Sequence, residues 1–407
     1  MIPSLRAQFN ASFSEDRYRA FVAEMERATG GSIEFRLSET PCFFPADLMD
    51  RLVDAAQAMV GQLFADPEYL AAADAVVPER FRLTGGESLP TCIQVDFGLV
   101  RQPDGHVEGR LVELQAFPSL YGFQMALAEK SAKKPSGGFF EDDDAEKASR
   151  RFFLDGLSSN SYRVLMRDVL VGPHDPDHVV LMEIQPQRQK TRPDFAVTEA
   201  TWGIRPVDTM DIVKDGRRLF YTRDGVLTPI RRIYNRVIPD ELDRSGARMP
   251  FDYRDDLDVE WIGGPDWFFR ISKFSIPWLR HPWVPETHFL SDITTMPTNR
   301  DEWLLKPLFS FAGGGIVFAP TDADLAAIPQ KQRANYILQR RVAFTPVVET
   351  PHGPTQAEIR LMMVRDGDAY RAVLPLVRMG RGKMMGVDHN KGLAWVGASA
   401  AIIPRDV

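Results

Sequence analysis

The spacing of hydrophobic and polar positions changes several times along this chain. Apolar residues recur at three- and four-residue intervals over 16–28 and 45–64, and this periodicity predicts two amphipathic helices. Pro45 suits the start of the second helix, because its fixed φ is compatible with a first helical turn. Two runs of strand-forming residues follow at 91–100 and 109–116, with turn residues between them, and they predict a pair of strands.

The rest of the chain alternates between strands and helices before its pattern changes again. A strand is expected after His178, a helix after Arg192-Pro193 and further strands at 217–221 and 230–238, which favours an open α/β layer. From Trp303 onward the order becomes strand, glycine loop, strand, helix, strand and hairpin, which is typical of mixed α+β structure. The expected regions are a helical start (1–80), paired strands (81–155), an α/β subdomain (156–245) and an α+β region (246–407).

Length and composition favour a soluble protein with more than one subdomain. A chain of 407 residues exceeds the size at which a single hydrophobic core stops growing. The net charge of −7 offers no general basic field for nucleic acid or an anionic membrane surface. The first residues lack the pattern of a secretory signal, and Cys42 and Cys92 lack the spacing of metal ligands. We therefore expect a cytoplasmic protein with no nucleic-acid partner and no membrane partner.

One segment differs in composition from the rest of the chain. Lys130–Lys147 (KSAKKPSGGFFEDDDAEK) combines a basic cluster, a Pro-Ser-Gly-Gly break and an acidic run. Since it offers little apolar surface to bury, it predicts an exposed connection. A lid that orders over a substrate is the alternative.

The first candidate for chemistry is a glycine loop between two apolar runs. Residues 302–318 read EWLLKPLFSFAGGGIVF, so that Lys306 precedes three consecutive glycines. Glycines let backbone N–H groups approach a ligand closely, and a nearby ammonium group supplies charge, so a polyphosphate suits this loop. The order of residues matches neither a Walker A loop nor a dinucleotide fingerprint. Taken alone, the glycine triplet is also compatible with a plain hairpin turn.

Two further segments, one on each side of the loop, favour a nucleotide site. The apolar strand 336–342 turns polar at its end, and such a segment can offer backbone groups to an adenine edge. Upstream, 267–274 (WFFRISKF) carries a second lysine among aromatic residues. This order of segments resembles the ATP-grasp superfamily, whose members hold ATP between two α+β subdomains. The resemblance implies that phosphates contact Lys273 and Lys306, that Ser310, Gly313, Gly314 and Gly315 cover them, and that Gln339, Arg340 and Val342 form the adenine hinge.

A candidate metal motif lies far upstream of the glycine loop. Asp96 is on one expected strand, and Glu113 and Gln115 are on the next. Residues two apart in a strand face the same side, so Glu113 and Gln115 project together, and Asp96 can join them from the neighbouring strand. Oxygen ligands of this kind suit Mg²⁺. The polar outer face of a hairpin is the alternative.

The surroundings of this motif resemble circularly permuted ATP-grasp ligases. The segment 95–121 is similar to one in the synthetase domain of glutathionylspermidine synthase and in eukaryotic-type glutathione synthetase, where the metal strands precede the glycine loop. The resemblance implies an ATP-grasp fold with a Rossmann-like pre-ATP-grasp layer over 156–245. There are three departures: Gln94 stands where the family tends to carry arginine, Gln115 where the glutathionylspermidine enzyme has asparagine, and 309–312 lacks the family's acidic residue.

The C-terminal third adds basic candidates. Arg378, Arg381 and Lys383 lie in the glycine-rich stretch PLVRMGRGKMMG, and they suit a carboxylate or an acyl phosphate through charge-assisted hydrogen bonds. The resemblance implies that this stretch lies near the reacting carboxylate, whereas a solvated basic loop is equally compatible with the sequence. Glu358 and Asn390 form a second candidate metal set.

The function that the resemblance implies is ATP- and Mg²⁺-dependent ligation of a carboxylate to an amine through an acyl phosphate. Such chemistry depends on positioning and charge neutralisation rather than on a covalent nucleophile. An ATP-grasp phosphotransferase, or a protein that binds nucleotide without catalysis, are the alternatives. The substrates would be small-molecule or peptide carboxylates and amines; their identities and the oligomeric state stay open.

Overall fold

The helices expected near the N-terminus are present. The computed structural model describes residues 1–31, 33–132, 150–310, 313–386, 390 and 392–404. Helices α2 (Glu15–Ala28) and α3 (Ala46–Ala65) confirm the predicted periodicity, and Pro45 immediately precedes α3. The other helices are α1 (Pro3–Ser12), α4 (Pro67–Ala75), α5 (Tyr121–Ala132), α7 (Ser159–Leu170), α8 (Arg192–Trp202), α9 (Pro239–Ser245), α10 (Trp267–Arg270) and α11 (Asp322–Ala326). Of the Lys130–Lys147 segment, only 130–132 at the end of α5 belong to the described residues.

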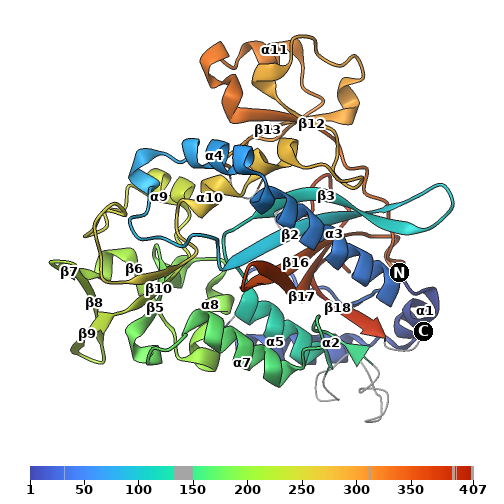
Figure 1. Ribbon diagram of the computed structural model, residues 1–407. Helices are drawn as coiled ribbons and strands as arrows, with labels where there is room; N and C mark the ends of the chain where they lie inside the picture. Colours follow the sequence, from blue (N-terminus) through green and yellow to red (C-terminus); the bar gives the residue numbers. More distant parts are fainter. Residues whose placement is uncertain (32, 133–149, 311–312, 387–389, 391, 405–407) are drawn as a thin grey trace.

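The strands of the described residues form four sheets, which confirms a mixed α and β fold (Figure 1). The central sheet has the order β1-β18-β17-β16-β2-β3, with β4 paired to β18. A parallel sheet has the order β11-β10-β5-β6, an antiparallel sheet has the order β12-β15-β13-β14, and β7-β8-β9 form a small meander. The strands are β1 (Cys42–Phe43), β2 (Cys92–Arg101), β3 (Val107–Gln115), β4 (Arg150–Arg151), β5 (Val179–Glu183), β6 (Arg205–Asp208), β7 (Val213–Asp215), β8 (Arg218–Arg223), β9 (Val226–Ile230), β10 (Arg232–Asn235), β11 (Glu260–Ile262), β12 (Thr287–Phe289), β13 (Trp303–Pro307), β14 (Val317–Phe318), β15 (Tyr336–Arg340), β16 (Gln356–Asp366), β17 (Ala369–Gly380) and β18 (Gly397–Pro404).

The central sheet joins strands that come from distant parts of the sequence. Strands β2 and β3, from the interval 81–155, form one end of this sheet, where β2 pairs with β16, and β17 and β18 from near the C-terminus continue it. The interval 246–407 is consequently divided among three sheets, since β11 joins the parallel sheet and β12–β15 form a sheet of their own. Local sequence patterns carry no information on pairing over such separations, so they could not reveal this division.

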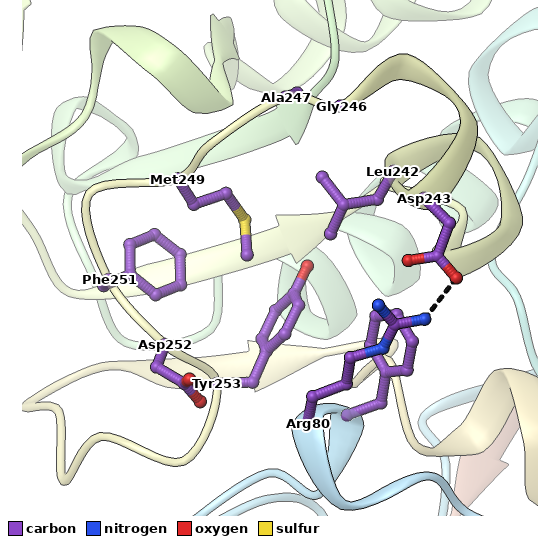
Figure 2. Close-up of a pocket in the computed structure, with 10 residues that line it drawn as sticks. Arg80, Leu242, Asp243, Gly246, Ala247, Met249, Phe251, Asp252 and Tyr253 are labelled. Atoms are coloured by element: carbon purple, nitrogen blue, oxygen red, sulfur yellow. Dashed lines mark hydrogen bonds and ion pairs between the residues drawn. The ribbon is translucent and has the colours of Figure 1, made fainter.

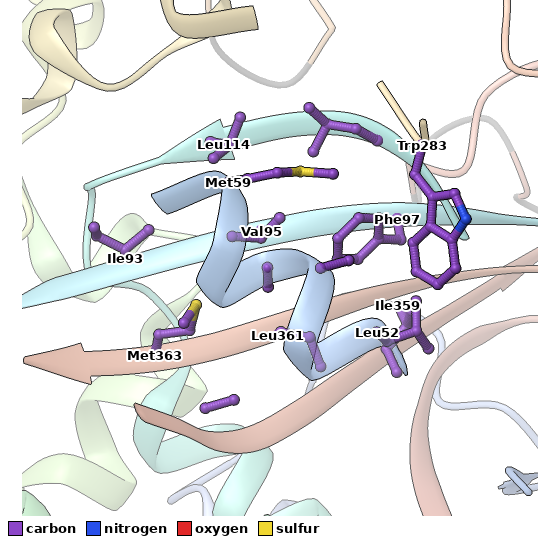
Figure 3. Close-up of a cluster of buried hydrophobic side chains, with 14 of the residues drawn as sticks. Leu52, Met59, Ile93, Val95, Phe97, Leu114, Trp283, Ile359, Leu361 and Met363 are labelled. Atoms are coloured by element: carbon purple, nitrogen blue, oxygen red, sulfur yellow. The ribbon is translucent and has the colours of Figure 1, made fainter. Parts of the chain in front are cut away.

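Helix α3 covers one face of the central sheet (Figures 1 and 3). Leu52 and Met59 of α3 pack in the same buried cluster as Val95 of β2. Successive residues of a strand point to opposite faces, so Gln94 and Asp96 project away from α3. Burying each large apolar side chain contributes about 1.5–3 kcal/mol. This energy determines which face of β2 packs against α3, and the opposite face therefore carries the polar side chains.

Helices α5 and α8 connect the central sheet to the parallel sheet. The buried Asp194 of α8 accepts hydrogen bonds from the backbone N–H groups of Gly122 and Phe123 at 2.9 Å and from that of Leu120 at 3.0 Å. It therefore satisfies the free N–H groups at the start of α5, the role of an N-cap supplied by another helix. None of the helices in the described part of the chain combines the length and apolar character needed to cross a bilayer.

The segment 267–274 forms two short helical turns. Helix α10 is followed by a 3-10 helix that begins at Lys273. The Ser272 hydroxyl accepts from the Phe274 N–H at 3.2 Å, and the Ser275 hydroxyl accepts from the Ser272 N–H at 3.2 Å, so two serines cap this turn reciprocally. Lys273 is thereby held in a buried position at the start of a rigid turn.

Candidate functional site

A network of opposite charges occupies the polar end of the central sheet. Asp96 on β2 is in register with Arg360 on β16, and the Arg360 guanidinium donates to both Asp96 oxygens, from Nε and from Nη2, at 2.6 Å each. Arg378 on β17 donates a third hydrogen bond to Asp96 at 3.0 Å. Burial opposes the ionisation of Asp96, but the two arginines still hold its pKa below the ordinary value. Both Asp96 oxygens are therefore engaged by arginines.

The two glutamines near Asp96 also accept hydrogen bonds from Arg360. Gln94 accepts from Arg360 Nη1 at 2.8 Å and donates to the Ser119 carbonyl at 2.6 Å. Gln115 is in register with Gln94, and its amide oxygen accepts from Arg360 Nη1 at 2.6 Å and Nη2 at 2.7 Å. The expected metal ligands Asp96 and Gln115 are thus brought together, but in a shell around a guanidinium group.

Two glutamates border this network. Glu113 is in register with Asp96, and its side chain is 30% exposed. Its nearest cations are Lys273 Nζ at 3.9 Å and Arg360 Nη2 at 4.0 Å, so no short ion pair engages its oxygens. Glu358 is buried, with Oε1 2.9 Å from Arg378 Nη1, and burial raises its pKa to about 7 although Arg378 acts against the shift. Glu113 is the carboxylate whose oxygens are most available.

Lys273 faces the glycine loop from the other side of the site. Its ammonium group donates to the Ser310 carbonyl oxygen at 2.7 Å. The Ser310 hydroxyl is buried and has no hydrogen-bond partner among the described residues. Beside it, Phe309 packs edge-to-face on Phe269, with ring centroids 5.1 Å apart. These contacts hold the start of the loop down against α10 and the turn that carries Lys273.

Lys306 and Gln339 share one face of the antiparallel sheet. Lys306 on β13 is in register with Ile337 on β15, and Gln339 is in register with Leu304, two residues before the lysine. Residues opposite each other and residues two apart project to the same side, so Lys306 and Gln339 are diagonal neighbours. Both side chains are at least 95% buried. Within the described residues, the Gln339 Nε2 has no hydrogen-bond partner. The charged groups that act on the Lys306 ammonium are Glu113, Lys273 and Glu358.

Burial affects the ionisation of Lys306. Desolvation lowers the pKa of Lys306 to about 8, and the nearby Lys273 acts in the same direction, whereas Glu113 acts against it. An ammonium group that is buried without a partner is unfavourable unless an anion compensates it.

The space between these groups is small in this conformation. A pocket with a cavity volume of about 30 Å³, roughly the volume of one water molecule, is lined by residues that include Glu113, Gln115, Phe268, Lys273 and Ser310. Among the described residues, Leu308 and Ser310 thus leave little room beside Lys273.

The glycine loop touches the C-terminal basic loop. Gly313 and Gly315 have φ of +75° and +72°, in the left-handed region that favours glycine. A Cβ atom added to Gly313 would lie 2.2 Å from Met384 Cε, and one added to Gly315 would lie 2.8 Å from Pro307 Cγ. Phe311 and Ala312, which connect Ser310 to Gly313, lie outside the described residues. The fold thus places the two candidate loops in direct contact, although their sequences are about seventy positions apart.

Asn390 holds the basic loop together. Its Oδ1 accepts from the N–H groups of Arg381 at 2.9 Å and Gly382 at 3.1 Å, and its Nδ2 donates to the carbonyls of Met384 and Gly386 at 3.1 Å each. The oxygen that was expected to bind a metal is thus used by two backbone donors. Its partner in that second metal set, Glu358, stays close to Arg378 instead.

The three basic candidates differ in their surroundings. Arg378 is inside the ionic network described above. Arg381 donates to the Thr355 hydroxyl at 2.8 Å and to the Ala394 carbonyl at 2.6 Å, so its guanidinium group is anchored in the protein. Lys383 is exposed at the tip of the loop. Only Arg378 and Lys383 retain polar groups that a ligand can reach without breaking these anchors.

The three residues of the expected adenine hinge also differ in whether their polar groups are already engaged within the protein. The Arg340 N–H donates to the Glu286 carbonyl at 2.7 Å, and its side chain points outward to Glu302. Val342 lies beyond the strand, where its carbonyl accepts from the Phe344 N–H at 3.1 Å. Gln339 is the hinge residue whose polar group is directed inward.

Arg360 was not among the candidates from sequence, although it organises the network. Its signal was the alternation of Glu358 and Arg360 in an otherwise apolar strand, because charged residues two apart predict a polar patch on one face. No cluster of three or more His, Cys, Asp or Glu side chains suited to a metal ion occurs among the residues that the structure describes.

The arrangement of the sheets corresponds to a glutathione synthetase-like fold. The glutathione synthetase-like effector GSS30 from Globodera pallida, in its apo form, superposes with a TM-score of 0.58 over 98% of this chain and 97% of that chain, at 12% sequence identity. At this identity the likeness establishes the fold alone, so the chemistry must be argued from the site. No protein-family model matches the sequence, and no curated protein matches it either.

Proposed function

We propose that this protein is an ATP- and Mg²⁺-dependent ligase that joins a carboxylate to an amine through an acyl phosphate, on a circularly permuted ATP-grasp fold. The observation that carries the proposal is the buried Lys306 ammonium beside the buried Gln339 amide on one sheet face, where the Gln339 Nε2 has no hydrogen-bond partner among the described residues. An unsatisfied buried group costs about 1–3 kcal/mol, and more when it is charged. A ligand with both a polyanion and a hydrogen-bonding purine edge would satisfy both groups at once.

The phosphate contacts follow from the positions of the two lysines. Lys306 and Lys273 carry the positive charge, and Ser310 with Gly313–Gly315 would cover the phosphates. The Ser310 hydroxyl has no hydrogen-bond partner among the residues that the structure describes, so it could donate to a phosphate oxygen. For adenine we favour the Gln339 side chain, because the Arg340 N–H is already bonded to Glu286.

The residues near the phosphates also suit Mg²⁺. Glu113 offers oxygens that lack short ion pairs, whereas Glu358 Oε1 lies 2.9 Å from Arg378 Nη1. Mg²⁺ needs few protein carboxylates, since it keeps waters and shares phosphate oxygens. We therefore assign Glu113 as the protein ligand of Mg²⁺, which would supply charge neutralisation at the phosphates. We no longer count Asp96 and Gln115 as metal ligands, because their side chains hold the Arg360 guanidinium group.

The reacting carboxylate would approach from the Arg378 side. Arg378 is 24% exposed, and its guanidinium plane is held by Asp96 on one side and Glu358 on the other. A carboxylate oriented there would attack the γ-phosphorus of ATP, so that ADP leaves and an acyl phosphate forms. An amine would then attack the acyl carbon and release inorganic phosphate and a proton, giving the amide. Ser310 and Gly313–Gly315, lying over the phosphates, would exclude the water that otherwise hydrolyses this intermediate. Lys383, which is exposed at the loop tip, would contribute charge.

The experiment is to incubate the purified protein with ATP, Mg²⁺ and pools of amino acids and polyamines. ADP release that depends on both an acid and an amine supports the ligase. ADP release with a phosphorylated product and no requirement for an amine indicates the phosphotransferase, and nucleotide binding without turnover indicates a non-catalytic protein. Lys306→Ala should abolish ATP binding, whereas Lys214→Ala, which removes an exposed lysine paired with Asp255, should not. Unchanged ATP affinity in Lys306→Ala would contradict the site.

A further inference from the structure

A second pocket lies apart from the nucleotide site. It is lined by the segment 246–253, the end of α9 and the short turn at Arg80 and Phe81 (Figure 2). Its cavity volume of about 320 Å³ is ten times that of the pocket beside Lys273. This volume is within the range of small-molecule sites, which combine apolar walls with a few polar groups.

The polar group of this pocket is a buried phenol. Tyr253 is 2% exposed, and its hydroxyl has no hydrogen-bond partner among the described residues. Figure 2 shows this hydroxyl directed into the space between Met249 and Leu242. Leaving it unpaired is unfavourable by about 1–3 kcal/mol, unless a ligand supplies the missing bond. Met249 is unbranched and only half-buried, so it can shift to let a ligand reach the hydroxyl.

The walls of the pocket are fixed by aromatic packing and by backbone hydrogen bonds. The Tyr253 ring lies 5.9 Å from that of Phe251, 5.6 Å from that of Trp261 and 6.2 Å from that of Phe81, measured between centroids. The Tyr253 carbonyl accepts from the Thr84 N–H at 3.2 Å. The site is therefore formed in advance, which lowers the ordering cost of binding.

The charges at the rim restrict the chemistry of the ligand. Arg80 is paired with Asp243 and lies over the Phe81 ring at 4.7 Å. Asp252 is held ionised, because hydrogen bonds from Arg254 lower its pKa to about 2. Two carboxylates and one arginine that is already paired make the rim unsuited to a polyanion such as a nucleotide.

We propose that this pocket binds a small uncharged molecule that has a branched or aromatic apolar body and one hydrogen-bond acceptor, such as an amide carbonyl. The apolar body contacts Leu242, Met249 and Phe251, and the carbonyl accepts from the Tyr253 hydroxyl. This site is independent of the proposed ligase function, since none of its lining residues takes part in the nucleotide site.

The test uses N-acetyl-phenylalaninamide and N-acetyl-leucinamide as neutral probes, with phenylacetate as an anionic comparison, in titrations followed by NMR. We expect saturable binding of at least one neutral probe to the wild type and weaker binding of phenylacetate. Tyr253→Phe should weaken the neutral probe about fivefold, the value of one neutral hydrogen bond. Ala247→Trp, which fills the cavity, should abolish binding.

The thermal stability of Tyr253→Phe distinguishes a ligand-binding role of the Tyr253 hydroxyl from a structural role. Because the hydroxyl is unpartnered, Tyr253→Phe should keep or raise the midpoint of thermal unfolding. Absence of binding by both neutral probes, equal affinity in Tyr253→Phe, or persistent binding in Ala247→Trp would each overturn the proposal, as would a loss of stability in Tyr253→Phe. ATP titration of the same variants should give wild-type affinity, so failure of this site and failure of the nucleotide site give different results.

Discussion

Arg360 binds Asp96 through two parallel hydrogen bonds of 2.6 Å, although 264 residues separate them in the sequence. The side chains are 8% and 1% exposed. A bidentate contact of this kind fixes the plane of the guanidinium group as well as its position. The same pair forms hydrogen bonds with Gln94, Gln115 and Arg378. These five side chains therefore form one connected ionic and hydrogen-bonded network.

Removing one partner of this pair should leave a buried charge without compensation. We expect Asp96→Asn to lower the free energy of unfolding by about 3–5 kcal/mol, measured by urea denaturation. Asp155→Asn is the matched control, because Asp155 pairs with Arg371 at the surface, and an exposed pair contributes about 0–1 kcal/mol. If both substitutions lowered the free energy of unfolding equally, the buried Asp96–Arg360 pair would contribute no more to stability than a surface pair, which contradicts this prediction.

Lys306 should make stability depend on pH in the alkaline range. Its pKa is about 8 in the folded protein and 10.5 in the unfolded reference, so the unfolded chain binds more protons between these values and stability rises with pH. From pH 7 to pH 9.5 this group should add about 2 kcal/mol to the free energy of unfolding. Lys306→Met should lack this rise and be more stable than wild type at pH 7. The quantity to measure is the difference between the two proteins, since other groups titrate in both; a difference independent of pH would refute the assignment.

Tyr69 should influence nucleotide binding without touching the nucleotide. Its buried hydroxyl donates to the Arg270 carbonyl at 2.6 Å and shares a 3.0 Å hydrogen bond with Ser275, on the turn that carries Lys273. Tyr69→Phe should cost about 1–2 kcal/mol of stability and also weaken ATP binding, measured by calorimetry. Tyr221→Phe, which removes a 2.8 Å bond to the Asp177 carbonyl in the β7-β8-β9 meander, should cost similar stability and leave ATP affinity unchanged. The same ATP affinity in both variants would exclude a positioning role for Tyr69.

Asn390 should control the order of the basic loop. Asn390→Ala removes two acceptor and two donor contacts to the backbone of 381–386. We expect faster trypsin cleavage after Arg381 or Lys383, because proteolysis requires local opening of the chain. Asn10→Ala removes one exposed bond to the Glu349 carbonyl and should leave this cleavage rate unchanged. A loop that resists trypsin equally in both variants would mean that Asn390 is dispensable.

The local part of the site could be predicted from sequence. Alternation over 91–100 and 109–116 predicted two strands whose polar faces meet, and the register confirms that Asp96 and Glu113 are opposite each other. The strand that carries Lys306 and the strand that carries Gln339 were likewise visible as apolar runs, and they pair directly. These features depend on side-chain periodicity and on contacts between residues that are close in the sequence. Both can be recognised in a single sequence.

The partners of these residues could not be predicted. Arg360 reaches Asp96 because β16 pairs with β2, and no periodicity reports which strand becomes the neighbour of another. The contact between Gly313 and Met384 has the same origin. The role of Asn390 depends on the path of the backbone after Arg381, which side-chain pattern does not encode. Residue type therefore identified side chains that can carry charge, whereas the pairing of strands determined which of these side chains are engaged in ion pairs.

The order of strands in the central sheet has a consequence for biosynthesis. Strands β2 and β3 leave the ribosome long before β16, whose Arg360 follows Asp96 by 264 positions. Until then the edge of β2 is unpaired, and its apolar side chains are without part of their cover, a state prone to aggregation. The nascent chain must therefore wait for its C-terminal hairpin, so the folding of this protein should be late, slow and dependent on chaperones rather than progressive from the N-terminus.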